Sequence, residues 1–264
     1  MSAEDLLFAV EDHVATITLN RPEKRNALTE DMSARLVECL EKVRRDADIM
    51  VAVLTGAGGT FSAGADLKQR AASGGGRARD ASPAAVVDAG LAHEWSTIRV
   101  EKPLIAAVDG YCLAAGMEIA LACDIRICTP SAQFGLPEIT RGFFAGAGGP
   151  QRLMRAIPQS QAMEIILTGD RIDAETAYRS GLVSRLVPAD ALMPTATAIA
   201  RRIAGHAPLA VKAAKETARA AHDQSLEEAL RLGQSLRWII GQTEDAKEGP
   251  RAFAEKRDPV YRGR

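Results

Sequence analysis

Three short runs of apolar residues, each ended by small residues, most constrain how this 264-residue chain can fold. They are residues 49–56 (IMVAVLTG), 104–110 (LIAAVDG) and 125–129 (IRICT). Continuous apolar runs of this length are expected of strands that are covered on both faces. A short helical segment, GMEIALAC, lies between the last two runs. This strand–helix–strand order predicts an α/β core.

The N-terminal region predicts two more strands and a capped helix. Residues 5–19 carry the apolar segments LLFAV and VATITL, which we interpret as a strand pair joined by a tight turn. Thr29 is predicted to cap a helix whose apolar positions recur on one face. These positions are Met32, Leu36, Leu40 and Val43. Residues 71–90 are rich in Gly and Ala and predict a mobile loop followed by the start of a helix.

The pattern becomes mostly helical from about residue 160 onward. We predict helices near residues 159–168, 173–180, 190–205, 208–222 and 225–240, with a short strand at 181–187. The expected organisation is a core of residues 1–195 followed by a helical region of residues 196–264. The apolar stripes of these last helices exceed what the core covers, which favours association between subunits.

Composition excludes several classes of function. The net charge of −1 argues against a broad basic surface for nucleic acid, so no nucleic-acid partner is expected. The four cysteines form no CxxC pair and the four histidines are scattered, so no metal site is expected. The N-terminus carries acidic residues where a signal peptide would carry basic ones. No apolar run reaches the roughly 18 residues of a membrane span. We therefore expect a cytoplasmic protein that does not bind membranes.

Three segments rich in small residues carry the chemical signal. They are FSAGADLK at 61–68, LAAGMEIALACD at 113–124 and FGLPEITRGFFAGAGG at 134–149. Small residues let a backbone approach a ligand closely and offer its N–H groups as donors. A helix that begins after such a turn also presents unpaired N–H groups to a developing negative charge. Glu118 and Glu138, from the second and third segments, add two carboxylates that can move protons.

Each of these features has an ordinary structural explanation when it is taken alone. The FSAGADL segment could be a tight packed turn, acidic residues favour the first turn of a helix, and Glu138 could be a solvated loop residue. The joint occurrence of all three in this order favours a site that stabilises a thioester enolate.

These segments closely resemble the enoyl-CoA hydratase/isomerase family, also called the crotonase superfamily. The resemblance covers nearly the whole chain, from ITLNRPEKRNAL to EGPRAFAEKRDPVYRGR. It implies an α/β fold, a spiral of ββα units, followed by a helical C-terminal region that forms trimers. The resemblance also implies a homotrimer or a homohexamer made of two trimers.

The resemblance implies specific roles for residues of this chain. The backbone N–H groups of Ala65 and Ala115 would form an oxyanion hole, although many relatives have glycine at the second position. Glu118 and Glu138 match the two glutamates that hold the reactive water, at the usual spacing of 20 residues. The N–H of Gly146 would help to position that water. The adjacent Phe143 and Phe144 depart from the common hydratase pattern and predict an unusual acyl pocket.

Coenzyme A would bind as part of an acyl-CoA thioester substrate, so no separate cofactor is expected. By resemblance, Lys24 and Arg25 would lie near the CoA phosphates, with Lys68 assisting. Ala63 and Asp66 would line the groove for adenine and pantetheine through their backbones. From a neighbouring subunit, Phe253 and Lys256 are further candidates for contact with CoA.

The leading hypothesis is an enoyl-CoA hydratase, which adds water across a 2-enoyl-CoA double bond to give a 3-hydroxyacyl-CoA. A dehydratase of the carnitinyl-CoA type and an enoyl-CoA isomerase remain alternatives on the same fold. A noncatalytic or RNA-binding protein is the alternative of a different class. A dinucleotide-binding site is set aside because GAGG lacks the GxGxxG spacing, and a serine hydrolase because Ser62 lacks the GxSxG context. The acyl chain and the direction of the reaction remain open.

Overall fold

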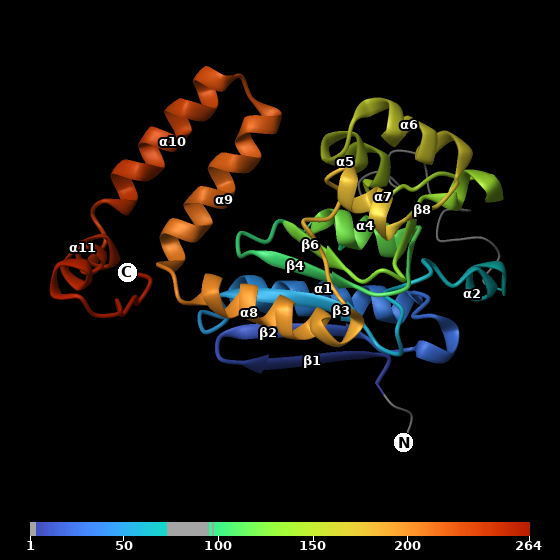
Figure 1. Ribbon diagram of the computed structural model, residues 1–264, viewed down its shortest axis with the longest axis horizontal. Helices are drawn as coiled ribbons and strands as arrows, with labels where there is room; N and C mark the ends of the chain where they lie inside the picture. Colours follow the sequence, from blue (N-terminus) through green and yellow to red (C-terminus); the bar gives the residue numbers. More distant parts are fainter. Residues whose placement is uncertain (1–3, 73–94, 97) are drawn as a thin grey trace.

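The computed structural model describes residues 4–72, 95, 96 and 98–264, which form two sheets covered by helices and a helical arm (Figure 1). One sheet has the strand order β1-β2-β3-β4-β6-β9, and a smaller sheet has the order β5-β7-β8. The strands are β1 (Leu6–Glu11), β2 (Val14–Leu19), β3 (Val51–Gly56), β4 (Leu104–Val108), β5 (Tyr111–Leu113), β6 (Ile125–Cys128), β7 (Gln133–Gly135), β8 (Ile172–Asp173) and β9 (Arg185–Leu186).

The predicted N-terminal strand pair and the three buried strands are confirmed. β1 and β2 pair antiparallel around a turn at Asp12 and His13, both of which adopt positive φ. β2, β3, β4 and β6 then pair in parallel. Every residue of β4 and all but the last of β3 are buried, as expected for central strands that are covered on both faces.

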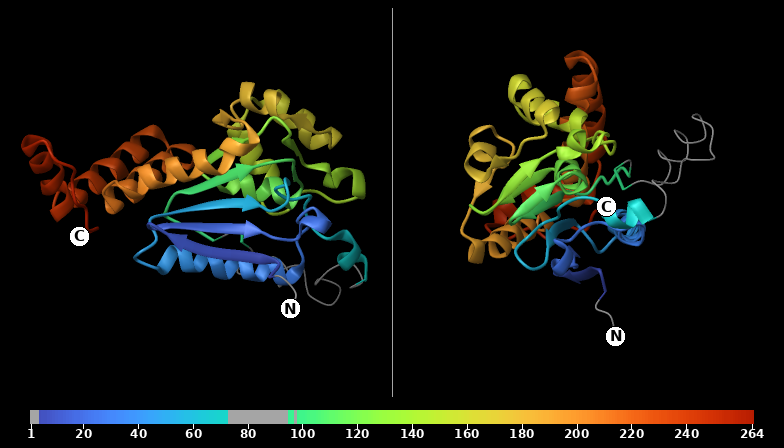
Figure 2. Two further views of the ribbon diagram at one scale, coloured as in Figure 1. Left: turned by 60° about the horizontal axis from the view of Figure 1, so that its bottom comes forward. Right: turned by 90° about the vertical axis from the view of Figure 1, so that its right-hand side faces the viewer.

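Two helices cover opposite faces of the larger sheet, as both figures show (Figures 1 and 2). Because side chains alternate along a strand, Ala52 and Leu54 of β3 pack with α1 (Glu30–Arg45). Val51 and Val53 pack on the other face with α8 (Leu192–Ala204). The predicted cap of α1 is confirmed, since Thr29 Oγ1 accepts a hydrogen bond from Met32 N at 3.1 Å. All four predicted apolar residues of α1 are buried.

The division predicted between residues 195 and 196 falls inside α8. Leu192, Ala196 and Ala200 belong to one hydrophobic cluster with strand residues of the larger sheet. Residues 196–204 therefore pack with the core, and the arm begins with the next helix, α9.

The remaining helices surround the smaller sheet or form the arm. The core elements are η1 (Pro22–Lys24), α2 (Leu67–Ala72), α4 (Ala115–Ala122), η2 (Pro137–Arg141), α5 (Gly149–Ala156), α6 (Gln159–Thr168), α7 (Ala174–Arg179) and η3 (Ala189–Ala191). The arm consists of α9 (Pro208–Asp223), α10 (Leu226–Ile240) and α11 (Glu244–Glu255). Helices α6 to α10 confirm those predicted, whereas the strand predicted at 181–187 is reduced to the two residues of β9.

The arm extends away from the two sheets, with α11 at its far end (Figures 1 and 2). The sequence pattern does not predict α11, because Gly249 and Pro250 stand in its middle. Thr243 nevertheless caps the helix by accepting from Ala246 N, and the buried Asp245 and Glu248 hold the chain that follows it. Arg262 N donates to Asp245 and Val260 N donates to Glu248. These contacts offset the hydrogen bond that proline cannot donate.

The loop and helix start predicted for residues 71–90 lie outside the described residues, except that residues 71 and 72 end α2. Within the described part of the chain, every helix is too short or too polar to span a membrane.

Candidate active site

The segment that follows β3 runs alongside β5 and brings the first two predicted motifs together. Ser62 N donates to Tyr111 O at 2.7 Å, and Leu113 N donates to Ser62 O at 2.9 Å. Gly64 has φ of +97°, and a side-chain carbon built on it would lie 3.4 Å from Ala115 N. The turn therefore requires glycine, because it adopts positive φ and touches the start of α4.

The two predicted oxyanion donors lie on either side of this contact. Leu28 N donates to Gly64 O and Asp66 N donates to Leu28 O, so the amide of Ala65, between them, faces away from Leu28. Ala115 is the first residue of α4, and its N–H has no acceptor within the helix. Among the described residues, neither N–H donates a hydrogen bond. The structure thus brings together two adjacent amides that are free to bind an anionic oxygen.

Backbone strain accompanies the second donor. Ala114, which precedes α4, adopts φ of 52° and ψ of −128°, a conformation that residues with a side chain rarely adopt. A hydrogen bond from Ala114 N to Gly135 O at 2.9 Å ties the strained residue to β7. Such strain persists only where surrounding contacts hold it, and it concentrates at functional sites.

Glu118 is buried in the first turn of α4 and is only 3% exposed. Its Oε1 accepts a hydrogen bond from Gly149 N at 2.9 Å. Burial, the largest cause, and the charge of the nearby Glu138 raise the pKa of Glu118 from its ordinary 4.5 to a net value of about 7. Hydrogen bonds from the backbones of Gly149 and Ala147 act in the opposite direction. A carboxyl group with a pKa near neutrality can accept and return a proton under physiological conditions.

Sequence reasoning missed Gly149, the residue that holds Glu118. A side-chain carbon at Gly149 would lie 3.1 Å from both Cγ and Oε1 of Glu118. The position therefore admits only glycine without movement of the carboxylate. Gly149 is also the first residue of α5, so its N–H has no acceptor within that helix. The run GAGG ahead of a helix was the available signal, but it does not specify which glycine faces the carboxylate.

Glu138 lies in η2 and is only 7% exposed. Its Oε2 is buried and has no hydrogen-bond partner among the described residues. Burial raises the pKa of Glu138 above its ordinary value. A buried carboxyl oxygen without a partner carries a large desolvation cost. That cost makes it a strong candidate for contact with a reacting water or substrate.

The loop between η2 and α5 contains the third glycine of interest, Gly146. A side-chain carbon at Gly146 would meet no atom within 4 Å, so its backbone borders open space. Phe144, on the same loop, is 68% exposed, whereas Phe143 is half-buried. The loop that follows Glu138 therefore exposes the backbone of Gly146 and the aromatic side chain of Phe144.

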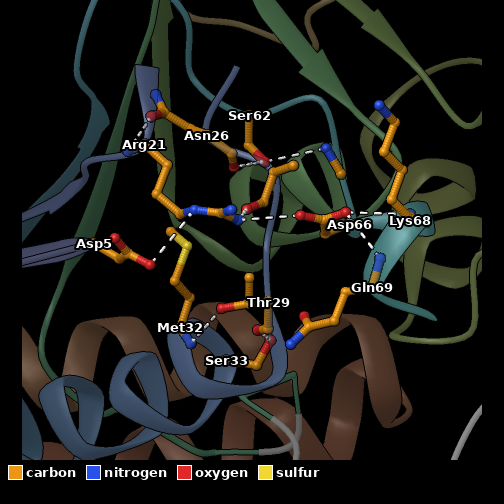
Figure 3. Close-up of polar contacts among 12 residues, drawn as sticks. Asp5, Arg21, Asn26, Thr29, Met32, Ser33, Ser62, Asp66, Lys68 and Gln69 are labelled. Atoms are coloured by element: carbon orange, nitrogen blue, oxygen red, sulfur yellow. Dashed lines mark hydrogen bonds and ion pairs between the residues drawn. The ribbon is translucent and has the colours of Figure 1, made fainter. Parts of the chain in front are cut away.

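The residues expected near CoA are drawn together by backbone pairing. Ala63 N donates to Arg25 O at 2.9 Å, which sets residues 24 and 25 beside residues 63–66. Lys24, Arg25 and Lys68 are all exposed. The side chain of Asp66 stabilises the start of α2, because its Oδ1 accepts hydrogen bonds from Lys68 N and Gln69 N (Figure 3). Because Asp66 N donates to Leu28 O, the backbone contact expected with CoA would have to use the carbonyl oxygen of Asp66.

A second cation, which the sequence did not indicate, lies against the same aromatic ring as Arg25. The guanidinium groups of Arg25 and Arg171 lie 5.1 and 5.2 Å from the ring centroid of Tyr111. Arg171 also donates to Gln133 Oε1 at 3.3 Å. Neither arginine forms an ion pair with a described carboxylate. The two charges approach each other only through the fold, since 146 residues separate them in the chain.

Phe253 and Lys256 are not brought to this site within one chain. Both belong to the end of α11, at the far tip of the arm, whereas α2 lies on the opposite side of the molecule (Figure 1). Phe253 is 87% exposed. Any contact between these residues and CoA would therefore require a second subunit.

Taken together, the described geometry offers two free amides for an anionic oxygen and two buried carboxyl groups whose pKa values are raised. The family model for enoyl-CoA hydratase/isomerase matches residues 9–264. The chain belongs to the enoyl-CoA hydratase/isomerase family. The match spans both sheets and the arm, as the motif resemblance predicted.

Several hydratases match the sequence of this chain over nearly their whole length. The chain is 44% identical to (E)-benzylidenesuccinyl-CoA hydratase of Thauera aromatica, covering 96% of this chain and 97% of that protein. It is 40% identical to 2,3-dehydroadipyl-CoA hydratase of Escherichia coli (strain K12), covering 98% and 99%. The crystal structure of an enoyl-CoA hydratase from Mycobacterium tuberculosis H37Rv matches with a TM-score of 0.90 at 38% identity, covering 99% and 100%. The expected fold is thereby confirmed.

Proposed function

We propose that this protein is an enoyl-CoA hydratase that adds water across the double bond of a 2-enoyl-CoA thioester. The observation that carries the proposal is the pair of buried carboxyl groups, Glu118 and Glu138, with raised pKa values. The free amides of Ala65 and Ala115 supply the matching site for an oxyanion. Relatives that are 40% and 44% identical carry hydratase names, which supports the same reaction here.

In the proposed mechanism, the thioester oxygen accepts hydrogen bonds from the N–H groups of Ala65 and Ala115. Ionised Glu118 takes a proton from water as the water oxygen attacks the β-carbon. The negative charge that forms on the thioester oxygen is stabilised by the two amides, each of which is typically worth about 3–4 kcal/mol. Protonated Glu138 then delivers a proton to the α-carbon. The reverse sequence removes water from a 3-hydroxyacyl-CoA.

Gly146 would donate its N–H to the attacking water, opposite Glu118 and Glu138. The open space beside Gly146 and the unpaired Oε2 of Glu138 support this assignment. A water held by a donor and two carboxyl groups is fixed in one orientation, which removes much of the entropic barrier to attack.

We propose that CoA binds across residues 24, 25 and 63–68. Lys24, Arg25 and Lys68 would neutralise its phosphates, and the backbones of Ala63 and Asp66 would line the groove. The unpaired guanidinium of Arg171, which shares the Tyr111 ring with Arg25, is added to this cationic group. CoA enters as part of the substrate, so the mechanism needs no other cofactor.

We also propose that the arm mediates assembly into trimers or pairs of trimers. Its helices expose large apolar side chains that the core of the same chain does not cover. They are Leu226, Leu230, Trp238, Ile239 and Phe253. Assembly through the arm would carry Phe253 and Lys256 to the CoA of a neighbouring subunit. The cytoplasm remains the expected location.

Mass spectrometry of the thioester product tests the reaction. Incubation with crotonyl-CoA should give a product heavier by one water, with the hydroxyl on the β-carbon. A product of unchanged mass with a moved double bond would instead indicate an isomerase. An unchanged substrate, with a folded protein that still binds CoA, would contradict the proposal and favour a noncatalytic role.

Substitution of the two glutamates should impair different steps of the reaction. Glu118→Gln should impair attack by water, whereas Glu138→Gln should impair transfer of the α-proton. Exchange of the α-proton of butyryl-CoA with deuterated water isolates the second step. The proposed roles require Glu138→Gln to lose more of this exchange than Glu118→Gln does, and the opposite order would reverse them.

A further inference from the structure

A cavity of about 450 Å³ lies along α4, the helix that carries Glu118 in its first turn. Its volume is within the usual range of about 300–1,000 Å³ for small-molecule sites. Ile119 and Ala122 of α4, the helix that carries Glu118, line one side, and Trp95 lines another. Because a helix rises about 1.5 Å per residue, this wall begins within one turn of Glu118.

The cavity is also joined to the catalytic loop through Arg152. The guanidinium of Arg152, which lines the cavity, donates to Ala147 O at 2.7 Å and to Ser96 O at 2.7 Å. The backbone N–H of the same Ala147 acts on Glu118 and lowers the pKa of its carboxyl group. The cavity and Glu118 are thus linked through α4 and through the contact between Arg152 and Ala147.

Positive side chains outnumber negative ones among the described residues that line the cavity. Four arginines line it but only two aspartates, and both aspartates are already paired. Arg219 pairs with Asp124 at 3.0 Å, and Arg155 pairs with Asp223 at 2.8 Å. Lys215, behind Asp124, adds a further positive charge to that pair.

Two cations remain without a described carboxylate partner. Arg126 donates from Nε to Leu182 O at 2.6 Å and from Nη1 to Cys123 O at 2.8 Å, both neutral acceptors. Arg152 donates to the two carbonyls described above and forms no ion pair with Glu118. Burial lowers the pKa of both arginines, so the surroundings disfavour their charge. An anion that entered the cavity would offset this cost and would find unused guanidinium donors.

We propose that the cavity receives the distal end of the acyl group and selects enoyl-CoA substrates whose acyl chain ends in a carboxylate, held by Arg126 and Arg152. The apolar wall formed by Trp95, Ile119 and Ala122 would pack against the methylene groups between the double bond and the carboxylate. This inference rests on the proposed hydratase activity and specifies its substrate class.

The test compares two substrates of equal length, 2-hexenoyl-CoA and 2,3-dehydroadipyl-CoA, which differ in a terminal methyl or carboxylate group. The wild-type protein should prefer the carboxylate substrate in kcat/KM by about tenfold or more, since a charged hydrogen bond contributes at least this factor. Competitive inhibition by adipyl-CoA should exceed that by hexanoyl-CoA in the same ratio. Equal or reversed preference in the wild type would overturn the proposal.

Variants then assign the preference to the cavity. Arg126→Met should reduce the ratio of the two kcat/KM values to about one, and Arg126→Lys should restore part of it. Arg155→Met serves as the matched control, because its charge is already paired and its side chain is mostly exposed. A ratio that stays at the wild-type value in Arg126→Met, or falls equally in Arg155→Met, would contradict the assignment.

The ratio of the two kcat/KM values tests the carboxylate site independently of the proposed hydratase activity. Hydration of 2-hexenoyl-CoA without any preference would leave the hydratase in place and reject the carboxylate site. Failure to hydrate either substrate or crotonyl-CoA would reject the hydratase itself, while the two inhibition constants would still report whether the cavity binds a carboxylate.

Discussion

Glu118 combines deep burial with two backbone donors, and this combination determines what it can do. Burial disfavours its charge, whereas the N–H groups of Gly149 and Ala147 favour it, with a resulting pKa of about 7. A group balanced in this way changes protonation state at little cost near neutral pH. Glu138 lacks described hydrogen-bond partners at Oε2, and burial raises its pKa above the ordinary value as well. The pair is thus suited to one base and one acid.

The pH dependence of hydration should follow from these states. The proposed base, Glu118, must be ionised, so kcat should fall as pH decreases through about 7. Glu138 must be protonated, so the rate should also fall as pH rises through its raised pKa. Steady-state rates with saturating crotonyl-CoA between pH 5 and 10 would measure both limbs. A rate that stays constant from pH 5 to 8 would contradict the role of Glu118.

The same raised pKa predicts a change in stability. Between pH 4.5 and about 7 the folded protein keeps a proton on Glu118 that the unfolded chain releases, so the free energy of unfolding falls as pH rises through this window. Glu118→Gln removes this titration. At pH 8 the variant should therefore be more stable than the wild type by up to about 3 kcal/mol, with little difference at pH 4.5. Urea unfolding at the two pH values measures the difference, and equal differences at both would contradict it.

Substitution of Gly149 should also lower the activity, because Gly149 N holds the carboxylate of Glu118. Alanine would bring a carbon to 3.1 Å from Glu118 Oε1 and 3.0 Å from Ala145 Cβ, forcing the carboxylate to move. Displacement of a reacting group by about 1 Å can cost about 100-fold in rate. Because the carboxylate has to move by only a few tenths of an ångström, we expect a loss of about tenfold in kcat for Gly149→Ala. The control is Gly233→Ala in α10, where the added carbon would meet only ordinary contact at 3.7 Å. Similar rates in both variants would contradict the assignment.

Sequence reasoning found the residues that motifs mark but not those that only the fold brings near. Glu118 and Glu138 stand in recognisable small-residue segments, so their spacing and order were informative. The contact between Gly149 and Glu118 spans 31 residues, and the approach of Arg171 to Arg25 spans 146. Such approaches depend on how the strands pair, which no local pattern specifies.

Among the elements, α9 forms two ion pairs with a single aspartate, Asp124. Asp124 follows α4 and accepts a hydrogen bond from Leu104 N at 2.8 Å. It also binds Lys215 Nζ at 2.6 Å and Arg219 Nη2 at 3.0 Å, both from α9. The Lys215 side chain is only 9% exposed, so its charge depends on this partner.

Removal of Asp124 should therefore be costly. Asp124→Ala leaves a buried ammonium group without its counter-charge, for which we expect a loss of about 3–5 kcal/mol in the free energy of unfolding. Arg219→Gln breaks the more exposed half of the same cluster and should cost under about 1 kcal/mol. Chemical denaturation of both variants tests the contrast. Equal losses would show that Lys215 is not the sensitive partner.

The elements that the sequence predicted are those with strong local signals. Apolar runs identified β3 and β4, and the spacing of four apolar residues with a threonine cap identified α1. α11 was missed because its stability comes from tertiary contacts of Asp245 and Glu248 with residues 257–263, which offset the unfavourable Gly249 and Pro250. β9 was overestimated, because Leu182 and Val183 are buried by packing rather than by strand pairing.

The whole molecule has one feature that a single chain leaves unexplained, the exposed apolar surface of its arm. Trp238 is 70% exposed and Phe253 is 87% exposed. Leaving such side chains in water forgoes about 1.5–3 kcal/mol each. This surface is the physical basis for the proposed assembly.

If the arm mediates assembly, a charged side chain placed on its apolar surface should dissociate the oligomer. Trp238→Glu should shift the mass measured by light scattering towards the monomer, whereas Trp238→Phe, which keeps an apolar ring, should retain the trimer or hexamer. Because Phe253 and Lys256 would come from a neighbouring chain, dissociation should also raise KM for the CoA thioester. A wild-type protein that is monomeric at micromolar concentration would contradict the proposal.

The decisive experiment is the initial rate at which enoyl-thioester absorbance disappears from crotonyl-CoA, measured for the wild type, Glu118→Gln and Glu138→Gln. Two glutamates that share one water require rapid loss in the wild type and a decrease of about 100-fold or more in each variant, with folding intact. A folded variant that retained a rate within about tenfold of the wild type would remove that glutamate from the mechanism.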